Sequence, residues 1–521
     1  MRGVDVAIDI KHYQMFINGR HVDADEMDEI RDPATEAVYA TVARGTADHA
    51  DAAVAAARAA FESGSWSRLA PADRSRVLTK IAERLREEIE DLVELEIHAN
   101  GATVRQAMGF HIGYTAPHFK YFAELAGSYE WERQVPTAAV PTLSTNVIRH
   151  EPLGVCAAIV PWNFPMLLGI WKVGPALAAG NSVIIKPDEK TPLTLLRLCE
   201  IAHECGVPAG VINLVTGPGA EVGARLAEHP DVDKVAFTGS TAVGREIMRL
   251  ASGTVKKVSL ELGGKGAQVL LDDADLDVAI DGALFGCMLY SGQICESGTR
   301  LLVSDKMYDL VVDRLVDRAS SLKLGDTTDL ATDVGPVISA RQRDRVLSFL
   351  DSARQSGAKV VLGGGAPLGD RFARGYWIEP TILTEVSNDM EVVREEIFGP
   401  VLCVLRYTDE ADAIRQANDS QYGLSAGVWS TDYERALEVA SQLRAGTVWI
   451  NNWHQIDPAL PFGGYKQSGL GRELGHDAID EYTETKHVHI DLTQKVERHI
   501  FAALLSEPPP ALSGSPRIGT N

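Results

Sequence analysis

A repeated alternation of apolar strands and helices between residues 155 and 250 constrains the fold of this chain most strongly. Each short apolar run is followed by a helical segment, and the runs occupy 155–160, 182–185, 211–215 and 234–237. Strands that alternate with helices at this spacing predict a parallel, doubly wound sheet. Because ligands bind such sheets at the carboxyl ends of the strands, we expect a site where these runs end.

A second alternation of this kind begins near Gly266. Its predicted strands lie at 267–271, 301–303, 360–362, 401–407 and 447–450. A chain of 521 residues is also too long for one core and should contain two or three domains. The predicted fold class is therefore α/β, with two doubly wound α/β domains.

Other segments fall outside these alternations. A strand at 13–17 followed by Asn18-Gly19 predicts a hairpin, and helical patterns cover 47–61 and 71–100. The stretch 131–153 is rich in Val, Thr and Pro and predicts a β-ribbon, and 486–492 is also strand-forming. An open edge strand favours pairing between subunits, so we expect a homodimer or homotetramer, although a local hairpin is the alternative.

Composition excludes several classes of protein. A net charge of -22 disfavours a nucleic-acid-binding surface, and no apolar run is long enough to span a membrane. The N-terminus lacks the apolar core of a signal peptide, so a cytoplasmic location is expected. The six cysteines are scattered, which argues against a disulfide framework and a metal site and fits a reducing compartment.

Cys295 is the first candidate for chemistry. It lies among small and polar residues after the apolar run 283–289, and Gly292 and Gly298 flank it, so a ligand could approach the backbone closely. A thiolate that a substrate can reach is a nucleophile. Taken alone, an inert, buried cysteine is the more common alternative.

Three turns at strand ends could bind a dinucleotide. The turns 216–219 and 237–244 contain glycines, and a helix that begins near Ser240 suits a pyrophosphate, although Gly and Thr also serve as simple caps. In the third turn, Lys186 and Glu189 follow a strand. A carboxylate there can accept hydrogen bonds from ribose hydroxyls, and a solvated charge cluster is the alternative.

Two further side chains suit catalysis. Asn163 follows a buried strand between two prolines and offers an amide donor for an oxyanion, unless it only satisfies its own turn. Glu261 stands between two leucines, a setting that raises the pKa of a carboxylate and suits a general base. Pairing with a buried backbone donor is the alternative for Glu261.

Together these motifs resemble the aldehyde dehydrogenase superfamily over about residues 13–490. The stretches that carry the resemblance are 161–165 (PWNFP), 186–189 (KPDE), 237–241 (FTGST), 260–265 (LELGGK), 292–295 (GQIC), 395–400 (EEIFGP), Asn451, 461–466 (PFGGYK), 468–469 (SG) and 471–473 (GRE). Any one of them could arise by chance, but their joint presence in order is highly specific.

The resemblance implies roles for particular residues. Cys295 corresponds to the nucleophile, Asn163 and the backbone N–H of Cys295 to the oxyanion hole, and Glu261 to the base that activates water. Lys172 and Glu473 correspond to proton-relay groups. The implied cofactor-binding residues are Val160, Trp162, Lys186, Glu189, Gly219, Phe237, Gly239, Ser240, Glu396 and Phe398.

The resemblance also implies the domain organisation. Residues 1–131 and 153–263 would form a Rossmann-like NAD-binding domain, and residues 264–467 a catalytic domain that carries the cysteine. Residues 132–152 and 481–495 would form a small β oligomerisation element, and the Pro-rich end, 496–521, is expected to be disordered.

The implied activity is oxidation of an aldehyde to a carboxylic acid with NAD, with NADP as a weaker alternative. The Glu189 carboxylate would repel a 2′-phosphate. A CoA-acylating aldehyde dehydrogenase is a first alternative, against which Glu261 argues. A non-catalytic, cofactor-binding structural protein is a second, against which the intact Cys295, Glu261 and Asn163 argue.

Several residues depart from the family's usual pattern, among them Asp188, Ser291 and Glu296, which directly follows Cys295. Glu296 could line the aldehyde tunnel and repel acidic aldehydes, or it could pair with Arg300. We expect the tunnel to be lined by Phe164, Leu168, Trp171, Trp453, Ile456 and Phe462, with His454 and Asp457 near its entrance. Neutral aldehydes are favoured as substrates, with cationic amino-aldehydes second.

Overall fold

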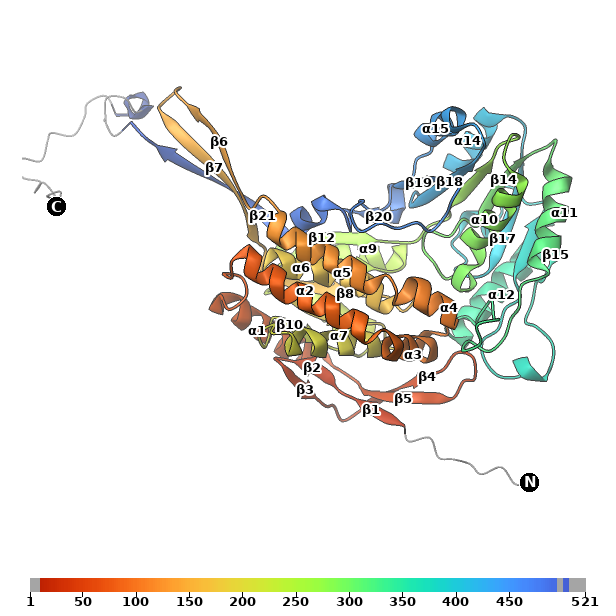
Figure 1. The fold of residues 1–521 in the computed structure, drawn as a ribbon, viewed down its shortest axis with the longest axis horizontal. Helices are drawn as coiled ribbons and strands as arrows, with labels where there is room; N and C mark the ends of the chain where they lie inside the picture. The colour runs from red at the N-terminus through yellow and green to blue at the C-terminus, as the bar shows by residue number, and fades with distance from the viewer. Residues whose placement is uncertain (1–9, 494–499, 506–521) are drawn as a thin grey trace, which may run out of the picture. The chain divides into compact units, whose positions relative to one another are not determined.

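A computed structural model describes residues 10–493 and 500–505 of the chain (Figure 1). Contacts divide the chain into two compact units. The larger unit contains the residues up to Gly127 together with Leu153–Tyr482, and the smaller one contains Ser128–Pro152 and the segment from Thr483 onwards.

Eight strands form the first sheet of the larger unit, in the order β20-β12-β11-β8-β9-β10-β2-β3. Strands β8 to β12 run parallel to one another, whereas β2, β3 and β20 are antiparallel to their neighbours. The bounds are β2 Met15–Ile17, β3 Arg20–Val22, β8 Val155–Ile159, β9 Ser182–Lys186, β10 Ile212–Leu214, β11 Lys234–Thr238, β12 Lys257–Glu261 and β20 Gly469–Leu470. The predicted parallel sheet and the N-terminal hairpin are both confirmed.

Helices cover this sheet. Val155, Ala157 and Ile159 of β8 pack in one apolar cluster with Ala53 and Val54 of α1, while α6 and α7 contact β8, β9 and β10. Strands covered in this way are apolar throughout, which explains the continuous runs in the sequence. The helix bounds are α1 Ala47–Ser63, α2 Pro71–Glu87, α3 Ile89–Asn100, α4 Val104–Gln106, α5 Thr115–Ser128, α6 Pro165–Ala179, α7 Leu193–Glu204, α8 Ala224–Glu228 and α9 Thr241–Ala251.

The helical pattern predicted over 71–100 forms two helices instead of one. The chain breaks at Glu88, whose φ of -95° and ψ of 18° end α2 before α3 begins. The Glu88 carboxylate accepts two hydrogen bonds of 2.7 Å from Arg197 of α7. The apolar period continues across the break, so periodicity alone does not reveal it.

Seven strands form the second sheet, in the order β15-β16-β17-β14-β13-β18-β19, and only β15 is antiparallel. The strands are β13 Ala267–Leu270, β14 Arg300–Ser304, β15 Lys359–Leu362, β16 Thr381–Thr384, β17 Val401–Tyr407, β18 Ser425–Trp429 and β19 Thr447–Ile450. The helices are α10 Leu276–Met288, α11 Tyr308–Ala319, α12 Ala340–Gln355, α13 Glu391–Arg394, α14 Glu410–Asn418 and α15 Tyr433–Gln442. The second predicted α/β pattern is therefore confirmed.

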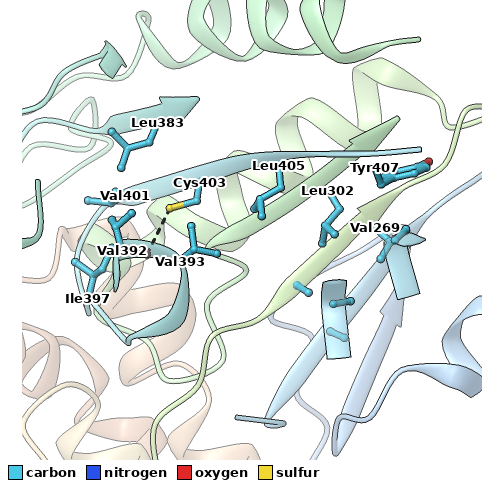
Figure 2. Packing of buried hydrophobic residues seen from close by; sticks show 14 of the residues in the cluster. Val269, Leu302, Leu383, Val392, Val393, Ile397, Val401, Cys403, Leu405 and Tyr407 are labelled. Atoms are coloured by element: carbon cyan, nitrogen blue, oxygen red, sulfur yellow. Dashed lines mark hydrogen bonds between the residues drawn. The ribbon is translucent and has the colours of Figure 1, made fainter. Parts of the chain in front are cut away.

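Strand β17 shows how both faces of the second sheet are buried. Val401, Cys403 and Leu405 belong to the cluster drawn in Figure 2, where the Cys403 thiol also approaches the carbonyl of Val392 in α13. The alternate residue Leu402 belongs to a second cluster with α10 and α11. Side chains that alternate between two covered faces give the strand its unbroken apolar sequence.

The predicted domain boundary at 263–264 falls between β12 of the first sheet and β13 of the second. Both sheets belong to the same compact unit, so this division stays a prediction. A small third sheet, β1-β5-β4, consists of Lys11–Tyr13, Val38–Ala43 and Met27–Arg31. Within residues 10–493 and 500–505, we find no helix with the length and apolar character needed to cross a membrane.

The smaller unit contains a three-stranded antiparallel sheet. Its order is β21-β7-β6, with bounds Thr483–Asp491, Ser144–Pro152 and Glu132–Ala138. The predicted ribbon and the predicted C-terminal strand therefore pair with each other, and their role in oligomerisation stays a prediction. Of the tail predicted to be disordered, 496–499 and 506–521 lie outside the described residues, and Ile500–Ala503 form a short 3-10 helix.

Candidate active site

The strand ends of the first sheet meet the loop that carries Cys295 at a cavity of about 720 Å³. Residues from the ends of β8, β11 and β12 line it, and so do Cys295 and a segment around Glu396 and Phe398. This is the edge at which parallel strands present their carboxyl ends, as the sequence predicted.

The Cys295 loop is held in an uncommon backbone conformation. Tyr290 and Ser291 have φ values of 47° and 53°, and Gly292 follows at 68°. Left-handed geometry is costly for residues other than glycine and persists only where contacts compensate for it. The Tyr290 hydroxyl donates to the Asn100 carbonyl at 2.8 Å, and the Ser291 hydroxyl donates to the Gly335 carbonyl at 2.7 Å. Ser291 thus anchors the turn that presents Cys295.

Asn163 lies beside Cys295, because both residues line this cavity and a second, apolar one. Asn163 Nδ2 donates to the carbonyl of Gln293 at 3.0 Å. A side-chain amide has two N–H donors, so one remains for a ligand. Asn163 and Cys295 thus line the same two cavities, and the role of Asn163 as an oxyanion donor stays a prediction.

Glu261, Lys172 and Glu473 form a cluster of buried ionisable side chains. Lys172 donates to Glu473 Oε1 at 2.7 Å and to the Thr238 hydroxyl at 2.6 Å. Burial raises the pKa of Glu261 well above its usual value, and the Glu473 carboxylate adds to this rise. Glu261 lines neither cavity, whereas its neighbour Leu262 lines the larger one.

The predicted cofactor residues separate into two groups. Residues of the first group line the large cavity: Trp162, Gly239, Ser240, Glu396 and Phe398. Residues of the second group do not line it: Val160, Lys186, Glu189, Gly219 and Phe237. Within the second group, Glu189 Oε1 accepts from the backbone N–H of Gly219 at 3.1 Å, while Asp188 and Lys190 next to it do line the cavity.

The lining residues fit an extended, phosphate-containing ligand. Ser240 caps the N-terminus of α9, and such a terminus favours anions. Glu396 Oε1 accepts from the Gly264 N–H at 3.0 Å, and burial raises the pKa of Glu396 to about 7. A side chain at Gly263 would collide with Glu396, so only glycine allows this approach.

Sequence reasoning missed the contribution of α12 to this cavity. Gln342 donates to the carbonyl of Phe398 at 2.8 Å, and Arg345 donates to that of Glu396 at 2.7 Å. Phe398 has a φ of 60° and packs edge-on against Trp162. Nothing in the pattern of α12 marks these two side chains, because their partners are backbone carbonyls more than fifty residues away.

The second cavity is narrow and apolar, with a volume of about 40 Å³. Its wall contains the predicted Phe164, Leu168, Trp171 and Ile456. The prediction was wrong for two residues, because Trp453 and Phe462 do not line it, and the place of Asp457 near the entrance stays a prediction. Trp453 is fully buried, and Phe462 packs behind Trp171 with a ring separation of 5.1 Å.

Phe110 and Tyr114 also line the apolar cavity, and sequence reasoning missed them. A π-helical turn over Ala107–His111 follows α4 and precedes Tyr114. An inserted residue of this kind rotates the following side chains away from the regular helical period. The apolar spacing therefore gave no signal for these two rings.

Glu296 lines the apolar cavity and does not pair with Arg300. Arg300 donates instead to the carbonyls of Lys265, Gln416 and Ala417. Glu296 Oε1 lies 3.0 Å from His454 Nδ1, and Oε2 lies 3.2 Å from Cys295 Sγ. Of the two alternatives for Glu296, the structure supports the first: the side chain lines the apolar cavity, and its partner is His454.

Three comparisons place these features among known proteins. The model of the aldehyde dehydrogenase family matches residues 21–488. The betaine aldehyde dehydrogenase of Bacillus subtilis is 45% identical over 478 residues, which cover 91% of this chain and 96% of that protein. A structure of the Staphylococcus aureus betaine aldehyde dehydrogenase in complex with NAD+ superposes with a TM-score of 0.90 at 39% identity, covering 93% of this chain and 96% of that one.

An NAD+ complex of an aldehyde dehydrogenase from Bacillus cereus superposes with a TM-score of 0.89 at 44% identity. The match covers 92% of this chain and 97% of that one.

Proposed function

Because the chain belongs to the aldehyde dehydrogenase family, we propose that it oxidises an aldehyde to a carboxylic acid with NAD+. The observation that carries this proposal is that Cys295 and Asn163 line both the large polar cavity and the narrow apolar one. A substrate in the apolar cavity and a cofactor in the polar one would meet at the thiol.

Cys295 attacks the aldehyde carbon, and the oxyanion that forms is held by Asn163 Nδ2 and the backbone N–H of Cys295. Donors placed in advance around an oxyanion are worth on the order of 10²–10³ in turnover each. When bound, NAD+ supplies the acceptor for the hydride that leaves the substrate carbon. A thioester on Cys295 remains.

Glu261 then takes a proton from the water that hydrolyses the thioester. Burial raises the pKa of this carboxyl group, and a higher pKa makes the ionised carboxylate a stronger base. Glu473, which holds Lys172, is the neighbouring carboxylate through which the proton leaves. The residues proposed to hold the cofactor are Trp162, Gly239, Ser240, Glu396 and Phe398 in the wall, with Val160, Lys186, Glu189, Gly219 and Phe237 at the strand ends around it.

The direct test of this function is NADH formation from simple aldehydes, followed by absorbance with and without CoA. We expect NADH and free carboxylic acid without CoA. Strict dependence on CoA would favour the CoA-acylating alternative, and no NADH with any aldehyde would favour a structural protein.

We expect NAD+ to be preferred over NADP+ by about tenfold or more in kcat/KM. Coulomb repulsion between the Glu189 carboxylate and a 2′-phosphate is worth roughly 1–4 kcal/mol at contact. Glu189→Gln should narrow the ratio of the two kcat/KM values. If only Asp188→Asn narrows it, the discriminating carboxylate is Asp188, which lines the cavity.

The apolar cavity also indicates a substrate class. Its wall contains the Glu296 carboxylate and four aromatic side chains of Phe, Tyr and Trp. In the part of the chain that the structure describes, no lysine or arginine lines this cavity. Aromatic faces and a carboxylate attract cations. The B. subtilis relative is named for betaine aldehyde. We therefore place cationic aldehydes first and neutral ones second, which reverses the ranking from sequence alone.

Three aldehydes test this ranking. Betaine aldehyde should have the highest kcat/KM, its neutral isostere 3,3-dimethylbutanal a lower one, and succinic semialdehyde the lowest, with about tenfold between extremes. Equal values for the first two would remove the charge argument, since the pair differs only in charge.

The smaller unit is proposed to join subunits into a homodimer or homotetramer. Val140, Leu143 and Ile490 of this unit are exposed apolar side chains, and such residues favour burial against another surface. Light scattering at micromolar concentration should give a multiple of 56.3 kDa. A monomeric mass would contradict this role.

A further inference from the structure

The base nearest to the Cys295 thiol is the carboxylate of the next residue. Within the described part of the chain, the one hydrogen bond of Cys295 Sγ is donated to Glu296 Oε2, at 3.2 Å. Among the described residues, Glu261 lines neither cavity and makes no hydrogen bond with the Cys295 sulfur. Its Oε2 finds no hydrogen-bond partner among the described residues. A carboxylate other than Glu261 is therefore in position to receive the thiol proton.

Glu296 is held in this position from three sides. Its Oε1 accepts from His454 Nδ1 at 3.0 Å, and its backbone carbonyl accepts from Trp453 Nε1 at 2.9 Å and from the Ser425 hydroxyl at 2.8 Å. The side chain is almost fully buried. A base fixed within hydrogen-bond distance of the proton it removes satisfies the geometric requirement for general base catalysis.

We propose that Glu296 accepts the proton of the Cys295 thiol during attack on the aldehyde, and that His454 is its positioning residue. The inference rests on the proposed function of Cys295. In this proposal Glu296 accepts the proton of the thiol, and Glu261 accepts the proton of the hydrolytic water. Two different carboxylates therefore act as bases in the two half-reactions.

The proton and charge balance closes over one cycle. As the sulfur–carbon bond forms, the S–H bond breaks, the proton moves to Glu296 Oε2, and the carbonyl π pair becomes the oxyanion. The sulfur becomes more acidic as it bonds to carbon, so transfer to a carboxylate is favourable at that stage. After hydride leaves and Glu261 has activated water, the departing Cys295 sulfur recovers its proton from Glu296.

The electrostatics of the pair agree with this assignment. Burial raises the pKa of Cys295, and the charge and hydrogen bond of Glu296 raise it further, so the resting sulfur is a neutral thiol. Burial alone would raise the pKa of Glu296, but the hydrogen bond and charge of His454 outweigh it and lower this pKa. Glu296 is therefore ionised and ready to accept a proton at neutral pH.

Few other titratable groups face this part of the site. Tyr114 is the remaining titratable residue in the wall of the apolar cavity, and burial raises its pKa. Glu396 and Glu261 act on the thiol from farther away and raise its pKa slightly more. Between pH 6 and pH 9, the pH dependence of the first half-reaction should therefore reflect the Cys295–Glu296 pair together with Glu396, whose pKa of about 7 lies in this range.

Two measurements on Glu296→Gln test the proposal. The first is the rate of Cys295 alkylation by iodoacetamide, which reports the thiolate present at rest. The second is the rate of the first-turnover NADH burst with propanal, a neutral aldehyde that avoids attraction to the carboxylate. Both are recorded against pH in the full-length protein, and NAD+ binding confirms that the variant is folded.

The proposal predicts opposite changes in the two rates. Removing the negative charge lowers the thiol pKa, so alkylation at pH 7 should become about tenfold faster. Loss of the base should slow the burst on the order of 10²-fold at pH 7. The burst of Glu296→Gln should then rise about tenfold per pH unit as thiolate forms, whereas the wild-type burst should change much less over the same pH range.

Other results would overturn the proposal. If both rates increase, Glu296 only suppresses the thiolate and is not the base; if neither changes, or both fall together, it has no role in proton transfer. Cys205→Ala is the matched control, since Cys205 lines neither cavity and this variant should keep both wild-type rates. Absence of NADH formation in the wild type would instead refute the proposed function itself, while the alkylation result would still report on the pair.

His454 has its own test. His454→Phe removes the donor to Glu296, so the Glu296 pKa should rise and the acidic limb of the burst profile should move to higher pH. His454→Asn keeps an N–H near the position of Nδ1 and should restore the profile. Equal profiles in both variants would show that His454 acts only as packing.

Discussion

Cys295→Ala should abolish NADH formation while leaving the fold and NAD+ binding intact. Cys295 lines both cavities, and no other cysteine of the described chain lines either one. Losing a nucleophile removes the covalent route, which costs on the order of 10⁴–10⁶ in turnover. The side chain is small and its loop is held by Tyr290 and Ser291, so truncation should not disturb the backbone.

The measurement pairs steady-state NADH production with NAD+ binding followed by protein fluorescence. Cys205→Ala is a suitable control, because Cys205 is a partly exposed free thiol at the end of α7, away from both cavities. It should retain full activity. Substantial activity in Cys295→Ala would place the nucleophile elsewhere and refute the mechanism.

Glu261→Gln should stop the enzyme after its first half-reaction. The carboxylate is needed to deprotonate water, whereas hydride transfer does not consume it, so one equivalent of NADH per site should form rapidly. Steady-state turnover should then fall by about 10²–10⁴. A thioester adduct on Cys295 should accumulate and be visible by mass spectrometry.

The pH dependence follows from the raised pKa of Glu261. Only the ionised carboxylate acts as a base, so wild-type hydrolysis should be slow below this pKa, increase as the pH rises through it, and level off above it. In Glu261→Gln, this rise of the hydrolysis rate with pH should be absent. Hydroxylamine attacks thioesters without help from a base and should restore turnover in Glu261→Gln. If Glu261→Gln reaches the wild-type steady-state rate in the absence of hydroxylamine, the assignment of Glu261 as the base is wrong.

Much of the fold could be predicted because its signals are local. The strands near 155, 182, 211 and 234 are buried on both sides, so their sequences are continuous apolar runs, and the helices between them carry regular periods. Cys295, Asn163 and Glu261 could be singled out because each lies in a short motif beside a glycine, proline or leucine that constrains the local backbone. Chemistry of this kind is encoded within a few neighbouring residues.

The partners of these side chains were decided only by tertiary structure. Glu296 meets His454 across 158 residues of chain, so its neighbour in sequence, Arg300, was an equally reasonable candidate. Phe110 and Tyr114 enter the apolar cavity through a π-helical turn that no apolar period reveals. Sequence alone therefore determined which strands end at one edge of the sheet, and it predicted which residues react there. Which carboxylate reaches the thiol depends on distances of about 3 Å between distant segments, and these are set by packing of the whole unit.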